Sequence, residues 1–241
     1  MKNTIILSVK KILALTCAIG AFGAVAHADI VFSNLNQPSG LFNSGASTNG
    51  GTAQIGDEVI LAGGQSGIVT NFSFEFYGSN FVGSAQSARV LFYANDGSAS
   101  PAGPLNPQSI LWDSGTFTIP DTFNPTYGTN CLVSFDLGAG VSVPGDFTWS
   151  VVFSGIGTSE SAGLVFSTGA PTVGSGYNDY WVNTGTVISP SWSLQVNPSY
   201  SVDFLAQIST VPEPSTGLML FSGLGVFAVI QWARRSSGKK Y

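Results

Sequence analysis

Apolar and polar residues alternate with a period of two along much of the chain between residues 30 and 208. Within residues 68–77 (IVTNFSFEFY), Phe72, Phe74 and Phe76 share one side, and the residues between them occupy the other. This alternation is typical of strands with one buried face, because successive side chains of a strand point to opposite faces. The pattern predicts about eleven short strands, at residues 30–32, 58–61, 68–77, 89–93, 110–112, 116–119, 132–135, 147–153, 164–166, 191–196 and 200–208.

Turn sequences separate these runs, and no helical pattern interrupts them. Asn95-Asp96-Gly97 and Pro144-Gly145-Asp146 combine residues that accept positive φ or pre-set a turn. No stretch of residues 29–209 has the apolar stripe of a helix for longer than one turn. Many short strands without crossover helices predict an all-β fold for residues 29–209, a two-sheet antiparallel sandwich that is jelly-roll-like.

The first 28 residues have the three parts of a secretory signal peptide. Lysines supply positive charge at the start, and residues 12–25 are apolar. Ala26 and Ala28 place small side chains at the two positions that signal peptidase inspects. We therefore expect a signal-peptide helix over residues 1–28, cleavage after Ala28 and export of the rest of the chain.

Residues 210–241 combine a short polar motif, an apolar run and a basic end. The motif is Val-Pro-Glu-Pro-Ser at 211–215, and the apolar run is 217–233. A helix of that length spans roughly 25 Å, close to the thickness of a membrane core. Four basic residues in 234–241 follow the positive-inside pattern, which places the folded domain outside the cytoplasm. We expect a transmembrane helix that anchors the chain in the inner membrane.

These three parts, in this order, resemble the PEP-CTERM sorting signal of bacterial surface proteins. The resemblance implies a bacterium with exosortase, a membrane enzyme that recognises Pro212, Glu213 and Pro214 and processes the tail. It also implies a final place at the cell surface or in the extracellular matrix, alongside secreted exopolysaccharide. Residues 30–120 are similar in style to bacterial choice-of-anchor surface domains, which supports a sandwich and brings no assigned activity.

The net charge of residues 29–211 excludes several classes of function. Between residues 29 and 211 there are twelve acidic residues and one basic residue, Arg89, a net charge of about −11. Such a surface repels nucleic acid, whose binding relies on Lys and Arg. The same region contains no histidine and no lysine, so it cannot form a Ser-His-Asp triad, a His-ligated zinc site or a Schiff base. We expect a protein that is not an enzyme.

A carboxylate pair of the glycosidase type is the catalytic arrangement that this composition leaves open. Asp57 with Glu58, and Glu75 with Asp113, are the candidate pairs. Arg89 is expected to pair with Glu75 or Asp113 on a neighbouring strand. No cofactor is expected, apart from Ca²⁺ as a minor option with oxygen ligands from Asn95, Asp96 and Asp113.

One aromatic cluster is a candidate sugar site. Its members are Tyr177, Asn178, Asp179, Tyr180 and Trp181, between glycine-rich turns. On a loop, the rings could stack on a sugar while the polar side chains bond its hydroxyls. In the alternative that we favour, the rings cap one end of the sandwich.

Together these features predict an exported protein that is a structural or adhesive component of an exopolysaccharide matrix. The alternatives are a carbohydrate-binding module with its site near residues 177–181 and a carboxylate glycosidase. The expected partners are signal peptidase, exosortase and extracellular polysaccharide, with no nucleic acid.

Overall fold

The computed structural model describes residues 28–35, 38–42, 53–83, 85–100, 105–121, 131–167, 169–196 and 202–210. All of them lie in one compact unit, Ala28–Val211. Most of the predicted signal peptide and the whole of 211–241, with its motif, apolar run and basic tail, lie outside the described residues. Within the described ranges no helix is long and apolar enough to cross a membrane.

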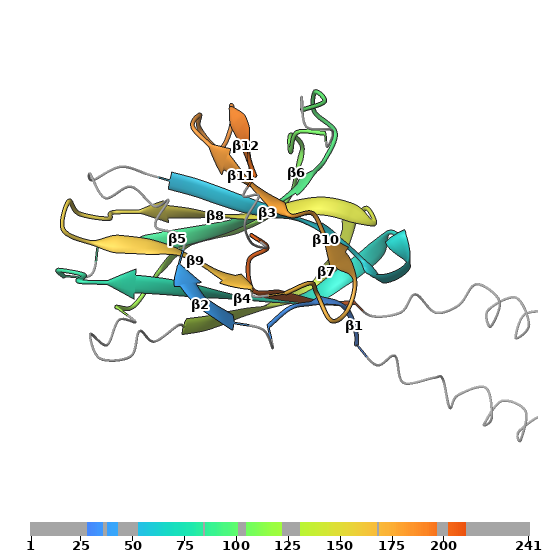
Figure 1. Ribbon diagram of the computed structural model, residues 1–241, viewed down its shortest axis with the longest axis horizontal. Helices are drawn as coiled ribbons and strands as arrows, with labels where there is room; N and C mark the ends of the chain where they lie inside the picture. The colour runs from blue at the N-terminus through green and yellow to red at the C-terminus, as the bar shows by residue number, and fades with distance from the viewer. Residues whose placement is uncertain are drawn as a thin grey trace, which may run out of the picture. The chain divides into compact units, whose positions relative to one another are not determined.

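The described strands form two antiparallel sheets packed as a sandwich, which confirms the predicted fold class (Figure 1). The first sheet has the order β1-β13-β4-β9-β2, and β7 pairs with β4. Its strands are β1 (Asp29–Ser33), β2 (Pro38–Phe42), β4 (Gly67–Ser79), β7 (Cys131–Val143), β9 (Ser161–Ser167) and β13 (Ala206–Thr210).

The second sheet has the order β12-β11-β3-β8-β5-β6, and β10 pairs with β3. Its strands are β3 (Ala53–Ile60), β5 (Ser87–Ala94), β6 (Ile110–Thr118), β8 (Asp146–Ser154), β10 (Ser175–Gly176), β11 (Asp179–Asn183) and β12 (Trp192–Val196). A short 3₁₀ turn, η1 (Ala62–Gly64), follows β3.

The core lies between the central strands of the two sheets. Phe72, Phe74 and Phe76 of β4 are fully buried, as their alternation predicts. They meet the rings of β8 across the interface, with centroid distances of 5.2 Å from Phe72 to Trp149 and 6.5 Å from Phe76 to Phe153. Tilted aromatic contacts of this kind add about 0.5–1.5 kcal/mol per pair beyond the burial of their surface.

The outer face of the second sheet is also largely buried. Thr148 and Ser150 point away from the core because they alternate with Trp149 on β8, yet neither is exposed to solvent. Tyr93 of β5 lies on the same face and packs edge-on against Trp192, with 5.4 Å between ring centroids. Val187 in the β11–β12 connection and Trp192 at the start of β12 therefore cover this part of the sheet.

Several strand boundaries differ from the sequence prediction. The strands expected at 110–112 and 116–119 are one strand, β6, because Gly115 at φ 67° lets it continue through a register shift opposite β5. The last strand begins at Ala206 and not at residue 200, and Phe204 makes only an isolated bridge to Phe166. Three strands, β2, β10 and β11, were not predicted; their apolar alternation is too short to signal a strand.

Candidate functional site

A cluster of carboxyl groups lies on the outer face at one end of the second sheet. Glu58 comes from β3, Asp146 begins β8, and Asn95 directly follows β5. The register pairs Ile60 with Asp146 and Ala94 with Phe147, so the next residue, Asn95, lies beside Asp146. Neighbouring strands of one sheet thus bring together residues that are far apart in the sequence.

A single amide bridges the two carboxylates of this cluster. Asn95 Nδ2 donates to Glu58 Oε1 at 2.8 Å and to Asp146 Oδ1 at 2.7 Å, while Thr148 Oγ1 donates to Asn95 Oδ1 at 2.7 Å. Glu58 is 2% exposed, and Glu58 Oε2 has no hydrogen-bond partner within the described ranges. Burial, and then the proximity of Asp146, raises the pKa of Glu58 to about 9. Glu58 is therefore protonated at neutral pH.

Asp57 lies on the opposite face of the same strand, inside the sandwich. Its Oδ2 accepts the backbone N–H of Phe204 at 2.7 Å. Burial, and then the charge of Asp203, raises the pKa of Asp57 well above its ordinary value. Successive residues of a strand point to opposite faces, so Asp57 and Glu58 do not form a catalytic pair. Glu75 and Asp113 do not form one either, because they lie on strands of different sheets.

The structure places the predicted aromatic cluster mostly on a strand and not on a loop. Asp179, Tyr180 and Trp181 belong to β11, which pairs with β3 on one side and β12 on the other. Trp181 is 1% exposed, and the ring of Tyr180 lies 5.4 Å from that of Phe204 in the core. The burial of Trp181 leaves little of its ring for a sugar to stack on, and Tyr180 is half-buried. Tyr177, at 39% exposed, is the most exposed ring of the cluster.

The calcium candidates have other partners. Asp96 accepts hydrogen bonds from the backbone and the hydroxyl of Ser109, at 2.9 and 2.6 Å. Asp113 forms an ion pair with Arg89, as the sequence predicted for that arginine. Asp113 pairs with Leu91, four residues before Asn95, so it lies roughly 13 Å along the strand from Asn95. Within the described ranges, no three His, Cys, Asp or Glu residues are grouped to hold a metal ion.

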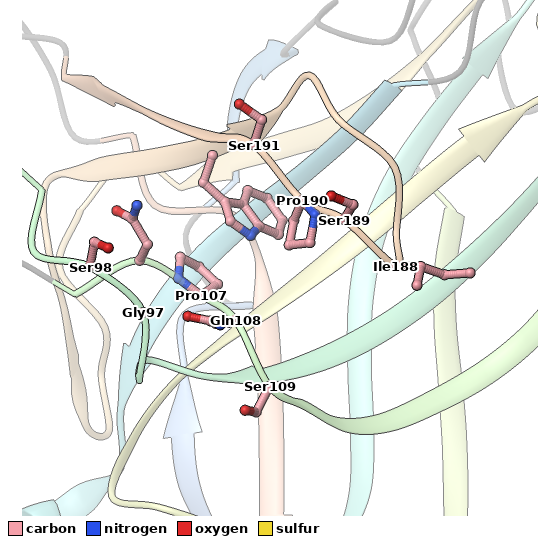
Figure 2. Close-up of a pocket in the computed structure, with 11 residues that line it drawn as sticks. Gly97, Ser98, Pro107, Gln108, Ser109, Ile188, Ser189, Pro190 and Ser191 are labelled. Carbon is pink, nitrogen blue, oxygen red and sulfur yellow. The ribbon is translucent and has the colours of Figure 1, made fainter.

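Two adjoining hollows open on the outer side of the second sheet. The larger encloses about 670 Å³ and the smaller about 350 Å³, and Asn106 and Trp192 line both. We call them together the Trp192 groove. Figure 2 shows the larger hollow between two segments, with Ser98, Pro107 and Gln108 on one side and Ser189, Pro190 and Ser191 on the other. Its walls are thus the β5–β6 connection and the β11–β12 connection.

The chemistry of the groove is neutral. The side chains that line it are hydroxyls, amides, prolines, two tryptophans and a few aliphatic residues, with no charged residue among them. The amides of Asn106 and Gln108 line the larger hollow. Of the aromatic cluster that the sequence predicts, Trp181 lines the smaller hollow. The rest of the groove could not be predicted, because serine, proline and amide residues in connecting loops carry no recognisable motif.

The comparison with known families gives a match near the C-terminal end of the chain. Residues 210–235 match the family described as the PEP-CTERM protein-sorting motif. The match includes Pro212, Glu213 and Pro214, which the sequence singled out. No curated protein matches the chain.

Proposed function

Given that the chain carries a PEP-CTERM motif and is sorted to the cell surface through exosortase, we propose that its β-sandwich is a structural or adhesive component of an exopolysaccharide matrix. The observation that carries this proposal is the position of the motif. The family match begins at Thr210, the last residue of β13, and the motif follows at 211–215, so the sandwich immediately precedes the signal. The folded domain is therefore what the sorting pathway delivers to the surface.

The route to the surface forms part of the proposal. Signal peptidase cleaves after Ala28, and the apolar run 217–233 holds the chain in the inner membrane until exosortase acts at Pro212–Pro214. The composition of both ends supports this order of events.

Co-sedimentation with the secreted polysaccharide of the producing bacterium tests the proposed function. The full-length chain, purified in detergent, is mixed with that polysaccharide in the presence and absence of EDTA. Retention in both conditions is the expected result. Retention that EDTA abolishes would support a calcium-dependent contact through residues such as Asn95 and Asp96. Absence of retention in both conditions would overturn the matrix role.

A carbohydrate-binding module with its site near Tyr177 is the second candidate. The exposure of Tyr177 supports it, although the burial of Trp181 leaves little aromatic surface there. Replacement of Tyr177 by Ala distinguishes this candidate, because a site centred on that ring loses affinity when the ring is removed.

We also propose that the domain is not an enzyme. The bridged carboxylates of Glu58 and Asp146 are the nearest approach to a glycosidase pair, and the burial of Glu58 argues against access of a substrate. Release of reducing sugar from the same polysaccharide would contradict this proposal, and loss of that release in Glu58→Gln would identify the pair as its source.

A further inference from the structure

We propose that the Trp192 groove is the glycan-binding site of this domain and that it takes an uncharged polysaccharide chain. This inference rests on the proposed function, since it names the surface through which the sandwich would adhere to the matrix. The site is formed by the β5–β6 and β11–β12 connections together with Trp181 of β11 and Trp192 of β12, and Tyr177 does not line it.

The shape of the groove fits an extended chain. Asn106 and Trp192 each line both hollows, so the two spaces adjoin. Ile188, 94% exposed, stands at the edge of the larger hollow. Two adjoining hollows offer room for more than one unit of a polymer.

The lining groups match the chemistry of sugars. Sugar hydroxyls both donate and accept hydrogen bonds, as do the amides of Asn106 and Gln108 and the hydroxyls of Ser98 and Ser191. An indole provides the flat apolar surface that the C–H face of a sugar ring requires, and Trp192 is only partly buried. A pocket that combines apolar walls with a few polar groups is the usual form of a small-molecule site.

The charges in and around the groove favour a neutral ligand over a charged one. The lining contains no cation, and the domain between residues 29 and 211 carries a net charge of about −11. An acidic polysaccharide would therefore meet repulsion without a compensating ion pair. A cationic ligand would find no carboxylate in the lining, and Asp96, next to Gly97, already accepts two hydrogen bonds from Ser109. The uncharged chain is the ligand that these groups favour.

Trp192 is held in place by the sheet beneath it. Its ring packs at 82° against that of Tyr93, which is fully buried. Tyr93 Oη accepts a hydrogen bond of 3.0 Å from Gln54 Nε2. The indole is thus positioned before a ligand arrives, so binding would order few side chains.

Co-sedimentation with fractionated polysaccharide tests the site. The secreted material is treated with protease and separated by anion exchange into neutral and anionic fractions. The full-length chain is compared with Trp192→Ala, with the double variant Asn106→Ala/Gln108→Ala, and with Tyr177→Ala as the matched control. The double variant keeps the test decisive if Trp192→Ala fails to fold, because Asn106 is only half-buried and Gln108 is exposed. Thermal unfolding checks that each variant is folded.

We expect the neutral fraction to retain the wild-type chain and Tyr177→Ala, and both groove variants to bind about tenfold more weakly or worse. Wild-type retention that the folded groove variants share would overturn the site and leave the matrix role standing. Retention by the anionic fraction alone would also overturn it. Binding that protease treatment removes would indicate a protein partner instead. If neither fraction retains the wild type, before or after protease treatment, the matrix role fails together with the site.

Discussion

Gln54 and Asn183, which lie 129 positions apart in the sequence, are joined by a hydrogen bond of 2.6 Å from Asn183 Nδ2 to Gln54 Oε1. The other atom of the same amide, Asn183 Oδ1, accepts the backbone N–H groups of Gly185 and Ser191, each at 2.8 Å. The side chain of Asn183 therefore bonds to both ends of the β11–β12 connection, which contains Ile188. It also ties this connection to β3 of the second sheet. The wall of the Trp192 groove depends on this amide.

Replacing Asn183 by Ala is expected to loosen that wall. Four hydrogen bonds of the Asn183 side chain disappear at once, to Gln54, Thr186, Gly185 and Ser191. Gly185 and Ser191 are exposed and can bond water instead, whereas Gln54 is buried and is left with an unpaired amide oxygen, which costs about 1–3 kcal/mol. Hydrogen exchange should accelerate at Gly185 and Ser191 while the strands of the first sheet keep their protection. Asn71→Ala, at an exposed position of β4, is the control. Unchanged exchange at both amides would show that the wall is held by other contacts.

Replacing Glu58 by Gln is expected to stabilise the domain at neutral and alkaline pH. The folded-state pKa of Glu58, about 9, lies above its ordinary value of 4.5, so folding favours the protonated form. The stability from this group is fully present below pH 4.5 and is lost as the pH rises toward 9. Each pH unit in that window costs up to about 1.4 kcal/mol. A neutral amide avoids this loss and can still accept from Asn95.

Urea unfolding at pH 5 and at pH 8 measures the effect. The gain in the free energy of unfolding for Glu58→Gln should be larger at pH 8 than at pH 5. Glu75→Gln, on a strand of the other sheet, controls for the removal of one negative charge. An equal gain at both pH values would contradict the assigned protonation of Glu58.

Replacing Gly174 by Ala is expected to destabilise the domain by more than about 2 kcal/mol. Gly174 has φ 74°, and a Cβ atom there would lie 2.6 Å from the carbonyl oxygen of Ile60. Gly83→Ala separates the two causes, because Gly83 has φ 92° and nothing within 4 Å of the added atom. The control should cost only about 1 kcal/mol, the backbone term alone. Equal costs in chemical denaturation would remove the steric argument.

Replacing Glu213 by Ala is expected to block processing of the tail. Glu213 lies in the matched sorting motif between Pro212 and Pro214. In the producing bacterium, the variant should accumulate as an uncleaved form in the membrane fraction, detected by immunoblotting and intact mass. Glu75→Ala, in the folded domain, should be processed normally. Normal surface delivery of Glu213→Ala would mean that exosortase does not read this residue.

The sequence predicts the sandwich well because its strongest signal is local. The alternation at Phe72, Phe74 and Phe76 follows directly from the pleat of a single strand, and the structure places all three in the core. The contact between Glu58 and Asp146 could not be predicted in this way. It depends on the pairing of β3 with β8, and pairing partners are not encoded in either strand alone.

The aromatic cluster is located less well. Its flanking glycines favour a loop, with the rings of Tyr180 and Trp181 either capping the sandwich, the interpretation that we prefer, or offering a sugar surface; the structure instead places both residues at the centre of a short paired strand. Five residues are too few for a period to be recognised. The groove could not be predicted either, because its walls come from the β5–β6 and β11–β12 segments, which are far apart in the sequence.

The pairing of β1 with β13 has a consequence for the timing of export. Asp29 lies opposite Thr210, so the first described strand of the domain pairs with its last, and β13 is inserted between β1 and β4. The first sheet therefore cannot close until the chain has been translocated as far as residue 210, where the match to the sorting family begins. Contacts of such long sequence separation form slowly. Completion of the fold is thus delayed until the sorting signal follows, which keeps translocation ahead of folding.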